Sequence, residues 1–345
     1  MCNYAVKEAN KQTIMKSERN NPPKGLQTLA HRTSIFSMSL GILFTIASLS
    51  FTSCKKKEKE ATPTATEDTE QTTATDNNMA ENTAADIESM GGQVSDGGSL
   101  ATYRTNETSA LDAVEASTCA VITKAGQVIT VDFGTVGCVG RDGRTRTGKL
   151  IYDFSGSSPS SAIHYRNPGF SMNVTSQNYV VDNFTVNITN KTVTNITPNT
   201  IPSTPNPGTN LKWSIAANIT ILKPGGGTIT WTCNRTKELT NTSDTTCYKG
   251  QVIPIDWTRA MVKLNGNASG VNAQSENFTA VASNLIRDFQ CSPDPLHMHR
   301  HPFVSGTIAY TPGSRPVRTI DYGNGACDLN ATVSIGTHVF NIVLP

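Results

Sequence analysis

The chain has 345 residues and a formal net charge of +2, but its charges are unevenly distributed. Residues 55–118 carry 5 basic and 13 acidic side chains, whereas residues 119–345 carry 18 basic and 12 acidic ones. The positive excess of the second segment is small for its length, so it excludes a strongly basic nucleic-acid-binding protein. The distribution indicates an acidic segment followed by a mildly basic domain.

An apolar segment lies near the start of the chain. Residues 35–51 contain no charged side chain, and basic residues from Lys16 to Arg32 precede them. The apolar run ends at Cys54, directly before the charged run of residues 55–60. A basic region followed by a short apolar region is typical of an export signal, so residues 1–54 are predicted to be a signal segment.

The residues that close this segment resemble the lipobox of bacterial lipoproteins. In that motif small residues, here Thr52 and Ser53, precede a cysteine, here Cys54. The resemblance implies that Cys54 is acylated on sulfur and tethers the protein to the outer membrane, on its periplasmic or its outer face. Two or three acyl chains hold a protein on a bilayer stably. The alternative is a single membrane-spanning helix with a basic flank.

Residues 55–117 are dominated by Thr, Ala, Asn, Asp and Glu, with almost no aromatic or branched aliphatic side chains. Such a segment buries too little apolar surface to offset the entropy lost on ordering. We therefore predict a disordered linker here.

From residue 118 to residue 345, short alternating runs end at turn residues. Examples are residues 128–133, 149–154, 228–233 and 333–344, which are rich in Thr, Val and Ile. These patterns indicate strands, and no long segment has helical periodicity. The predicted fold is all-β and antiparallel, either a β-sandwich or a large twisted meander.

A nine-residue motif occurs twice in this domain. Residues 130–138 (TVDFGTVGC) align without a gap with residues 319–327 (TIDYGNGAC). The alignment indicates an internal duplication, in which the domain could consist of two similar halves. The domain has six cysteines, and their number and spacing fit disulfides formed in an oxidising compartment. Fifteen pairings are open to them, of which the simplest joins Cys119 to Cys138, Cys291 to Cys327 and Cys233 to Cys247.

The motif strings resemble those of surface or periplasmic lipoproteins of the Bacteroidetes. The strings are DFG-x-x-x-C, GRDGRTRTGK at residues 140–149, and DYGNGACD at residues 321–328. The resemblance implies a cell-envelope location and a β fold. It implies no catalytic activity.

Three histidines alternate along the chain at His297, His299 and His301. In a strand they would project from one face, about 7 Å apart, as ligands for zinc or copper. Prolines on both sides favour the alternative of a polar loop.

A basic cluster follows Cys138. Arg141, Arg144 and Arg146 lie within six residues beside Asp142, where an anionic glycan or lipid head group could bind. The favoured interpretation is a solvated loop with one internal salt bridge.

Trp213, Trp231 and Trp257 are the three tryptophans of the chain. They would suit a platform on which sugar rings stack. Core packing is the favoured alternative for tryptophans in strands.

Asp132 and Asp321 occupy matching positions in the repeated motif. They are candidates for calcium binding or for an acid/base pair. An Asp before an aromatic-Gly turn more often accepts backbone N–H bonds, so we expect that role, with Phe133 and Tyr322 in the core.

The sequence contains no G-x-S-x-G, H-E-x-x-H or phosphate-loop motif, which lowers the case for an enzyme. The leading hypothesis is a lipid-anchored envelope protein without catalytic activity that binds a glycan or another envelope component, or that serves structurally, with no cofactor. Two alternatives remain open: a hydrolase acting on polysaccharide, and a metal-handling surface protein.

Overall fold

The computed structural model describes residues 68, 70–97, 119–140, 142–199, 209–241, 255–293 and 301–344. Residues 65–345 form one compact unit. Cys54 and the rest of the predicted signal segment lie outside the described residues. Among the residues described, no helix is long and apolar enough to span a membrane.

The compact unit is one large antiparallel sheet. Its strands follow each other in chain order, and each pairs with the next, except that β3 lies beside the path and pairs with β4. The bounds are β1 (Val121–Ala125), β2 (Val128–Asp132), β3 (Cys138–Val139), β4 (Thr145–Asp153), β5 (Ser171–Val181), β6 (Phe184–Asn195), β7 (Lys212–Leu222), β8 (Thr228–Leu239), β9 (Met261–Val271), β10 (Asn277–Asp288), β11 (Phe303–Pro312), β12 (Arg318–Asn324), β13 (Asn330–Ile335) and β14 (His338–Val343). The prediction of an antiparallel all-β fold is confirmed, in its meander form.

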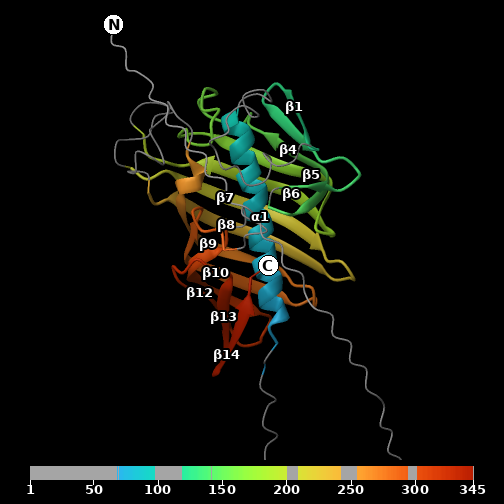
Figure 1. The fold of residues 1–345 in the computed structure, drawn as a ribbon, viewed down its shortest axis with the longest axis vertical. Coiled ribbons are helices and arrows are strands. Elements are labelled where there is room, and N and C mark those ends of the chain that lie inside the picture. The colour runs from blue at the N-terminus through green and yellow to red at the C-terminus, as the bar shows by residue number, and fades with distance from the viewer. Residues whose placement is uncertain are drawn as a thin grey trace, which may run out of the picture. The chain divides into compact units, whose positions relative to one another are not determined.

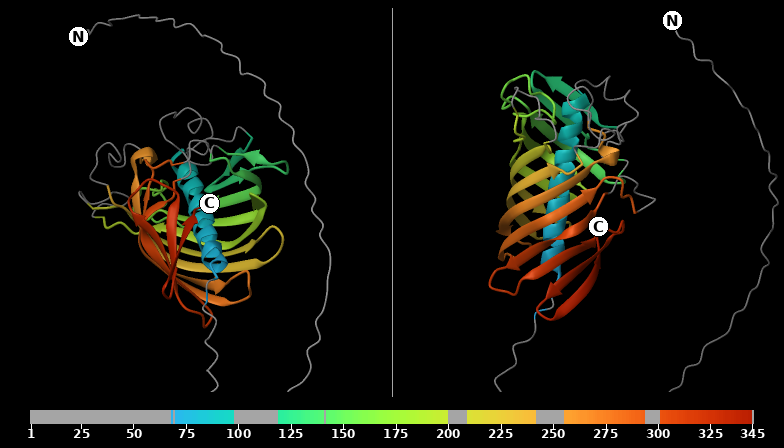
Figure 2. Two further views of the ribbon diagram at one scale, coloured as in Figure 1. Left: turned by 60° about the horizontal axis from the view of Figure 1, so that its bottom comes forward. Right: turned by 90° about the vertical axis from the view of Figure 1, so that its left-hand side faces the viewer.

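The sheet curls around a single long helix, α1 (Thr72–Gly97), which lies in its hollow and crosses the strands (Figures 1 and 2). The first residues of α1 lie near β12, and its last turn lies near β4 and β5 (Figure 1). The short 3-10 helix η2 (Trp257–Arg259) precedes β9. The inner face of the sheet and the helix therefore share one core.

The prediction of a disordered linker over residues 55–117 is wrong for the 26 residues Thr72–Gly97, which form helix α1. Its apolar residues are few and small, but Ala80, Ala84, Ile87 and Met90 are all buried. A helix of this composition has little stability alone, because most helix stability in proteins comes from packing. Here the sheet supplies the packing.

Glycine at position 91 allows the helix to approach the sheet closely. A Cβ atom at Gly91 would meet the side chain of Met172 and would lie 2.7 Å from Cε1 of Tyr152. The Tyr152 hydroxyl donates a hydrogen bond to the Ile87 carbonyl at 3.0 Å. The last turns of α1 thus rest directly on β4 and β5.

The strands alternate as the sequence predicts. In β8, Ile229, Trp231 and Cys233 face inward and are buried, whereas Thr228 and Thr232 face outward and are exposed. The outer face of the neighbouring strands is likewise formed mainly by Thr, Asn and Ser. Outward polar side chains and inward apolar ones are what a sheet with one solvated face requires.

The two copies of the motif lie near the two ends of the sheet. Each copy follows a cysteine and begins in the second strand of a hairpin, β2 of β1–β2 in the first copy and β12 of β11–β12 in the second. The next paired strand, β4 or β13, follows each copy. The duplication therefore relates two edge units, and the strands between them lie outside it.

Two disulfides fasten these units as predicted. Cys119 pairs with Cys138 and Cys291 pairs with Cys327, with Cα–Cα distances of 5.7 and 5.3 Å. The third expected disulfide, between Cys233 and Cys247, is wrong, because the Cys233 thiol is free and buried. Its side chain faces the helix from the middle of β8, whereas Cys247 lies outside the described residues.

Candidate functional site

Basic side chains stand at inward positions of several strands, among apolar neighbours. They include Arg146 on β4, Lys191 on β6, Arg235 on β8 and Arg318 on β12, all nearly inaccessible to solvent. A buried charge is costly unless it is paired and hydrogen-bonded. Each of these cations has an acidic partner in α1 or in the residues just before it, and Arg146 also pairs with Asp142 before β4.

The Glu88 carboxylate on α1 accepts three hydrogen bonds. It accepts hydrogen bonds from Lys237 Nζ at 2.8 Å, from Lys191 Nζ at 3.1 Å and from the Tyr165 hydroxyl at 2.7 Å. Burial opposes its ionisation, but the two lysines outweigh burial and lower the pKa of Glu88 to about 2. Glu88 is therefore an anion at neutral pH.

Aromatic rings surround Lys237. Its ammonium nitrogen lies 5.1 Å from the ring centroid of Tyr165, 5.5 Å from that of Trp213 and 5.4 Å from that of Trp257, distances at which cation–π attraction operates. Trp231 is also buried. The three tryptophans thus belong to the core, as the alternative interpretation expected, and the proposed sugar-stacking platform is corrected because none has an exposed ring face.

The basic cluster after Cys138 also binds α1. Arg146 donates to Asp142 and, at 2.8 Å, to Asp86 on the helix. Arg144 bonds Asp182 at 2.8 Å and Asp86 at 3.3 Å. Burial opposes ionisation of Asp86, but the two arginines lower its pKa below the ordinary value. The internal salt bridge expected for this loop is present, but the expectation that the loop is solvated is wrong, because Arg146 and Asp142 are buried against α1. Both arginines are paired with carboxylates.

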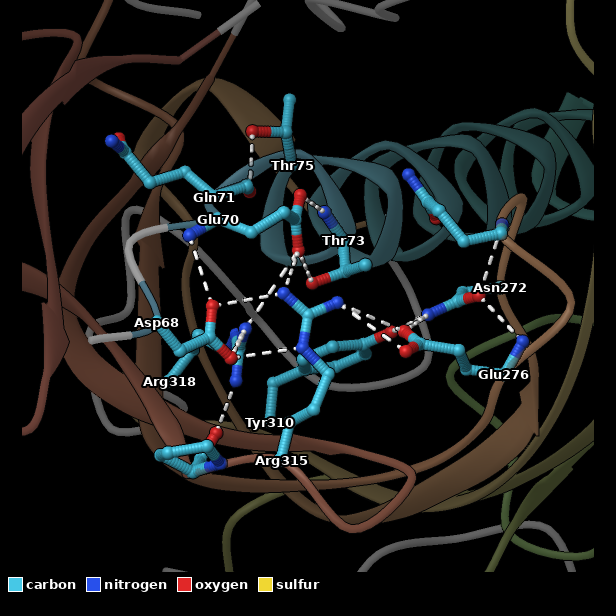
Figure 3. Close-up of polar contacts among 12 residues, drawn as sticks. Asp68, Glu70, Gln71, Thr73, Thr75, Asn272, Glu276, Tyr310, Arg315 and Arg318 are labelled. Atoms are coloured by element: carbon cyan, nitrogen blue, oxygen red, sulfur yellow. Dashed lines mark hydrogen bonds and ion pairs between the residues drawn. The ribbon is translucent and has the colours of Figure 1, made fainter. Parts of the chain in front are cut away.

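A second set of ion pairs holds the residues before α1 (Figure 3). Arg315 lies between Asp68, to which it donates at 2.8 and 2.9 Å, and Glu276, at 3.2 and 3.3 Å. Arg318 donates to Asp68 at 2.6 Å, and Glu70 accepts from the Thr73 backbone at 3.0 Å. Hydrogen bonds from Arg315, with help from Arg318, hold the pKa of Asp68 well below its usual range. These pairs anchor the first turn of the helix.

A cavity of about 320 Å³ runs along the side of α1 that faces away from the middle of the sheet. Its volume is at the lower end of the range for small-molecule sites. The helix contributes residues between Thr75 and Ser89, and the far wall comes from the turns beside β4, β6 and β7 and from the C-terminal strands. The apolar lining consists of Met79, Phe184, Pro302, Phe303, Leu329 and Leu344.

Polar groups line the cavity along the helix, and those near its start include Asp76 and Asn78. Lys223 pairs with Asp76 at 2.5 Å, and burial raises the pKa of Asp76 above its ordinary value. The Tyr322 hydroxyl donates to Asn78 Oδ1 at 2.8 Å. Asn78 is 1 % exposed, and its Nδ2 has no hydrogen-bond partner among the described residues. The cavity thus combines an apolar wall with one buried donor.

The structure brings together only part of the histidine cluster and of the basic cluster. His301 lines the cavity and its Nδ1 lies 2.7 Å from the Cys291 carbonyl oxygen. His297, His299 and Arg141 lie outside the described residues. Within the described part of the chain, no group of three or more His, Cys, Asp or Glu side chains is arranged to hold a metal ion.

Asp132 and Asp321 have the role that we expected. Asp132 accepts a hydrogen bond from the Gly134 backbone at 2.9 Å, and Asp321 accepts one from Gly323 at 2.8 Å. Phe133 and Tyr322, which face inward, are buried. Both aspartates therefore stabilise the turns in which they lie.

Sequence reasoning missed Asp76, Asn78, Asp86 and Glu88, because all four lie in the segment predicted to be disordered. A signal was available in the strands. Arg146, Lys191, Arg235 and Lys237 occupy positions that the alternation assigns to the inner face, and buried cations require acidic partners. The acidic segment before the domain was the richest source of such partners.

Comparisons of this chain with protein families, with curated proteins and with solved structures find no match.

Proposed function

We propose that this chain is a lipid-anchored protein of the bacterial cell envelope, without catalytic activity, whose sheet domain binds a small envelope component in the cavity along α1. The anchoring half of the proposal is supported by the lipobox-like residues that end at Cys54. The two disulfides fit the oxidising compartment outside the inner membrane.

The binding half of the proposal depends on one observation, the cavity of about 320 Å³ with its apolar wall and its buried amide donor. Concave, mostly apolar sites with few polar groups are typical of small-molecule binding. Burial of the three tryptophans removes the feature that favoured a polysaccharide. An amphiphilic component of the envelope suits the cavity better than a sugar chain.

Anchoring is tested by growing the expressing bacterium with an alkyne analogue of palmitate. Incorporation is expected in the unmodified chain and should disappear in the Cys54→Ser variant. Cys2→Ser is the matched control, because it removes the other N-terminal cysteine and should leave the label in place. Equal labelling of the two variants would refute anchoring at Cys54.

Binding is tested independently, by native mass spectrometry of the purified full-length chain released from detergent. A bound small molecule that is lost when the cavity is filled by a Leu329→Trp substitution supports the cavity as its site, because Leu329 lines the cavity. A bound molecule that is retained by the filled variant places the site elsewhere.

A further inference from the structure

The charged groups around the cavity are held by other groups of the wall. Lys223 is paired with Asp76, and Arg144 is paired with Asp86 and Asp182. Arg287 also lines the cavity, where it donates to Asn82 Oδ1 at 3.0 Å and lies over the Phe303 ring. A charged ligand would have to displace one of these partners or enter without a counter-ion, and a buried charge without a partner is strongly destabilising. The wall therefore disfavours both anions and cations.

The lining includes buried polar atoms without a hydrogen-bond partner among the described residues, among them Asp76 Oδ2, an acceptor, and Asn78 Nδ2, a donor. The Oδ1 atom of Asn78 is occupied by the Tyr322 hydroxyl, so the orientation of the amide is fixed, and its Nδ2 keeps a donor for which the described residues provide no acceptor. A buried donor without an acceptor destabilises a protein, because it has lost its hydrogen bonds to water. A ligand oxygen at this position would remove that cost.

Resting on the proposed function, we infer that the cavity takes an uncharged amphiphile, with one hydrogen-bond acceptor oxygen on Asn78 Nδ2 and an apolar body against Phe184, Phe303 and Leu344. The polar end of this ligand lies toward the first half of α1, where Asn78 is, and its apolar body follows the lining side chains. A ketone, an ester or an alcohol oxygen meets the requirement equally. The size of the cavity limits the ligand to a small molecule.

The test uses the lipidated full-length chain in lipid nanodiscs and an eight-carbon ketone that carries a diazirine. After photolysis, peptide mapping is expected to find the label in peptides from α1 and from the C-terminal strands. Unlabelled 2-octanone should compete for this labelling, whereas octanoate and octyltrimethylammonium should compete at least about tenfold more weakly. These measurements use the unmodified chain, so their result does not depend on the folding of any variant.

Two variants then locate the acceptor and the body of the ligand. Asn78→Asp keeps an oxygen for Tyr322 but removes the Nδ2 donor, so competition by 2-octanone should weaken about three- to tenfold, while competition by octane should not change. Leu329→Trp should abolish labelling. Leu222→Trp is the matched control, since Leu222 is 41 % exposed at the end of β7 and does not line the cavity.

The outcomes separate the two proposals. If octanoate or the ammonium compound competes as well as 2-octanone, or if Asn78→Asp leaves ketone competition unchanged, the cavity binds ligands but the inference about their chemistry is wrong. If labelling of α1 and of the C-terminal strands is absent, or persists in Leu329→Trp, the binding half of the proposed function fails too.

Discussion

Lys237 on β8 donates a hydrogen bond to Glu88 on α1 at 2.8 Å, across 149 positions of sequence. Because Lys191 donates to the other oxygen of the same carboxylate, one acidic side chain of the helix neutralises two lysines of the sheet. Both lysines would be left without a carboxylate if this one were removed. The relationship explains how a polar helix is retained in the core.

The first prediction concerns that carboxylate. Glu88→Gln removes the negative charge while keeping the shape of the side chain, and should lower the free energy of unfolding by about 3–5 kcal/mol, because two buried lysines lose their counter-ion. The measurement is a urea unfolding midpoint. Glu238→Gln is the control: Glu238 pairs with Lys212 and Lys263 at the surface, so the change should cost about 1 kcal/mol or less. Equal costs for the two variants would contradict this assignment.

The second prediction concerns acid. The pKa of Glu88 is lowered from an ordinary value of 4.5 to about 2, so its charged form stabilises the folded chain. A carboxylate whose pKa is lower in the folded chain contributes its full stabilisation at a pH above its pKa in the unfolded chain. This stabilisation is lost as the pH falls through the pKa of the group in the folded chain. Stability should thus decline by about 3 kcal/mol from this group between about pH 5 and pH 2. Unfolding midpoints measured across this range should fall less steeply in Glu88→Gln than in the unmodified chain.

The third prediction compares adjacent glycines in α1. Alanine is intrinsically better than glycine in a helix by about 1 kcal/mol. At Gly92 the nearest side-chain atom to a new Cβ is 3.5 Å away, so Gly92→Ala should stabilise by up to that amount. At Gly91 the new methyl group would overlap Met172 and Tyr152, so Gly91→Ala should destabilise by about 1–3 kcal/mol. Thermal unfolding followed by circular dichroism measures both, and a stabilising Gly91→Ala would show that α1 does not rest on β4 and β5.

The fourth prediction concerns the cysteines. Burial raises the pKa of the Cys233 thiol to about 12, so iodoacetamide should modify it only after denaturation. A non-reduced digest should contain the peptide pairs of Cys119 with Cys138 and of Cys291 with Cys327. Detection of a peptide that joins Cys233 to another cysteine would contradict the structure. The experiment needs no variant.

The fifth prediction concerns the start of the helix. Asp68→Asn weakens the ion pairs with Arg315 and Arg318, so the first turn of α1 should exchange its amide hydrogens faster while the sheet remains protected. Hydrogen exchange followed by mass spectrometry resolves the two regions. Asp153→Asn is the control, because Asp153 bonds only its own turn through the Ser155 backbone among the contacts described. Unchanged exchange in residues 72–76 would show that Asp68 does not anchor the helix.

The strands were predictable from the sequence because apolar and polar side chains alternate along each strand. This pattern can be recognised within a few neighbouring residues. The turn roles of Asp132 and Asp321, and two of the three disulfides, followed from the same local patterns. Helix α1 was not predictable in this way. Its apolar stripe is narrow and consists of Ala80, Ala84, Ile87 and Val94. Its polar residues are held by basic side chains up to 205 positions away in the chain.

The cavity could not be predicted from the sequence either, because its lining residues are far apart in the chain. Asn78 and Met79 come from the segment that was expected to be disordered, and Leu329 and Leu344 come from the far end of the chain. No local pattern relates these positions. The charge imbalance between the acidic segment and the basic strands was the one global sign that the two belong together.

The order of these elements along the chain has a consequence for biosynthesis. Each strand of the meander can form a hairpin with its predecessor as soon as both have been synthesised, whereas Asp68 and Asn78 must wait for Arg318 and Tyr322, the latter 244 residues beyond its partner. These two residues precede every strand of the sheet and yet are among the last to find their partners. A chain truncated before β12 would retain most of its hairpins and the lysines that bind Glu88, but would lose Arg318 and Tyr322, the partners of Asp68 and Asn78.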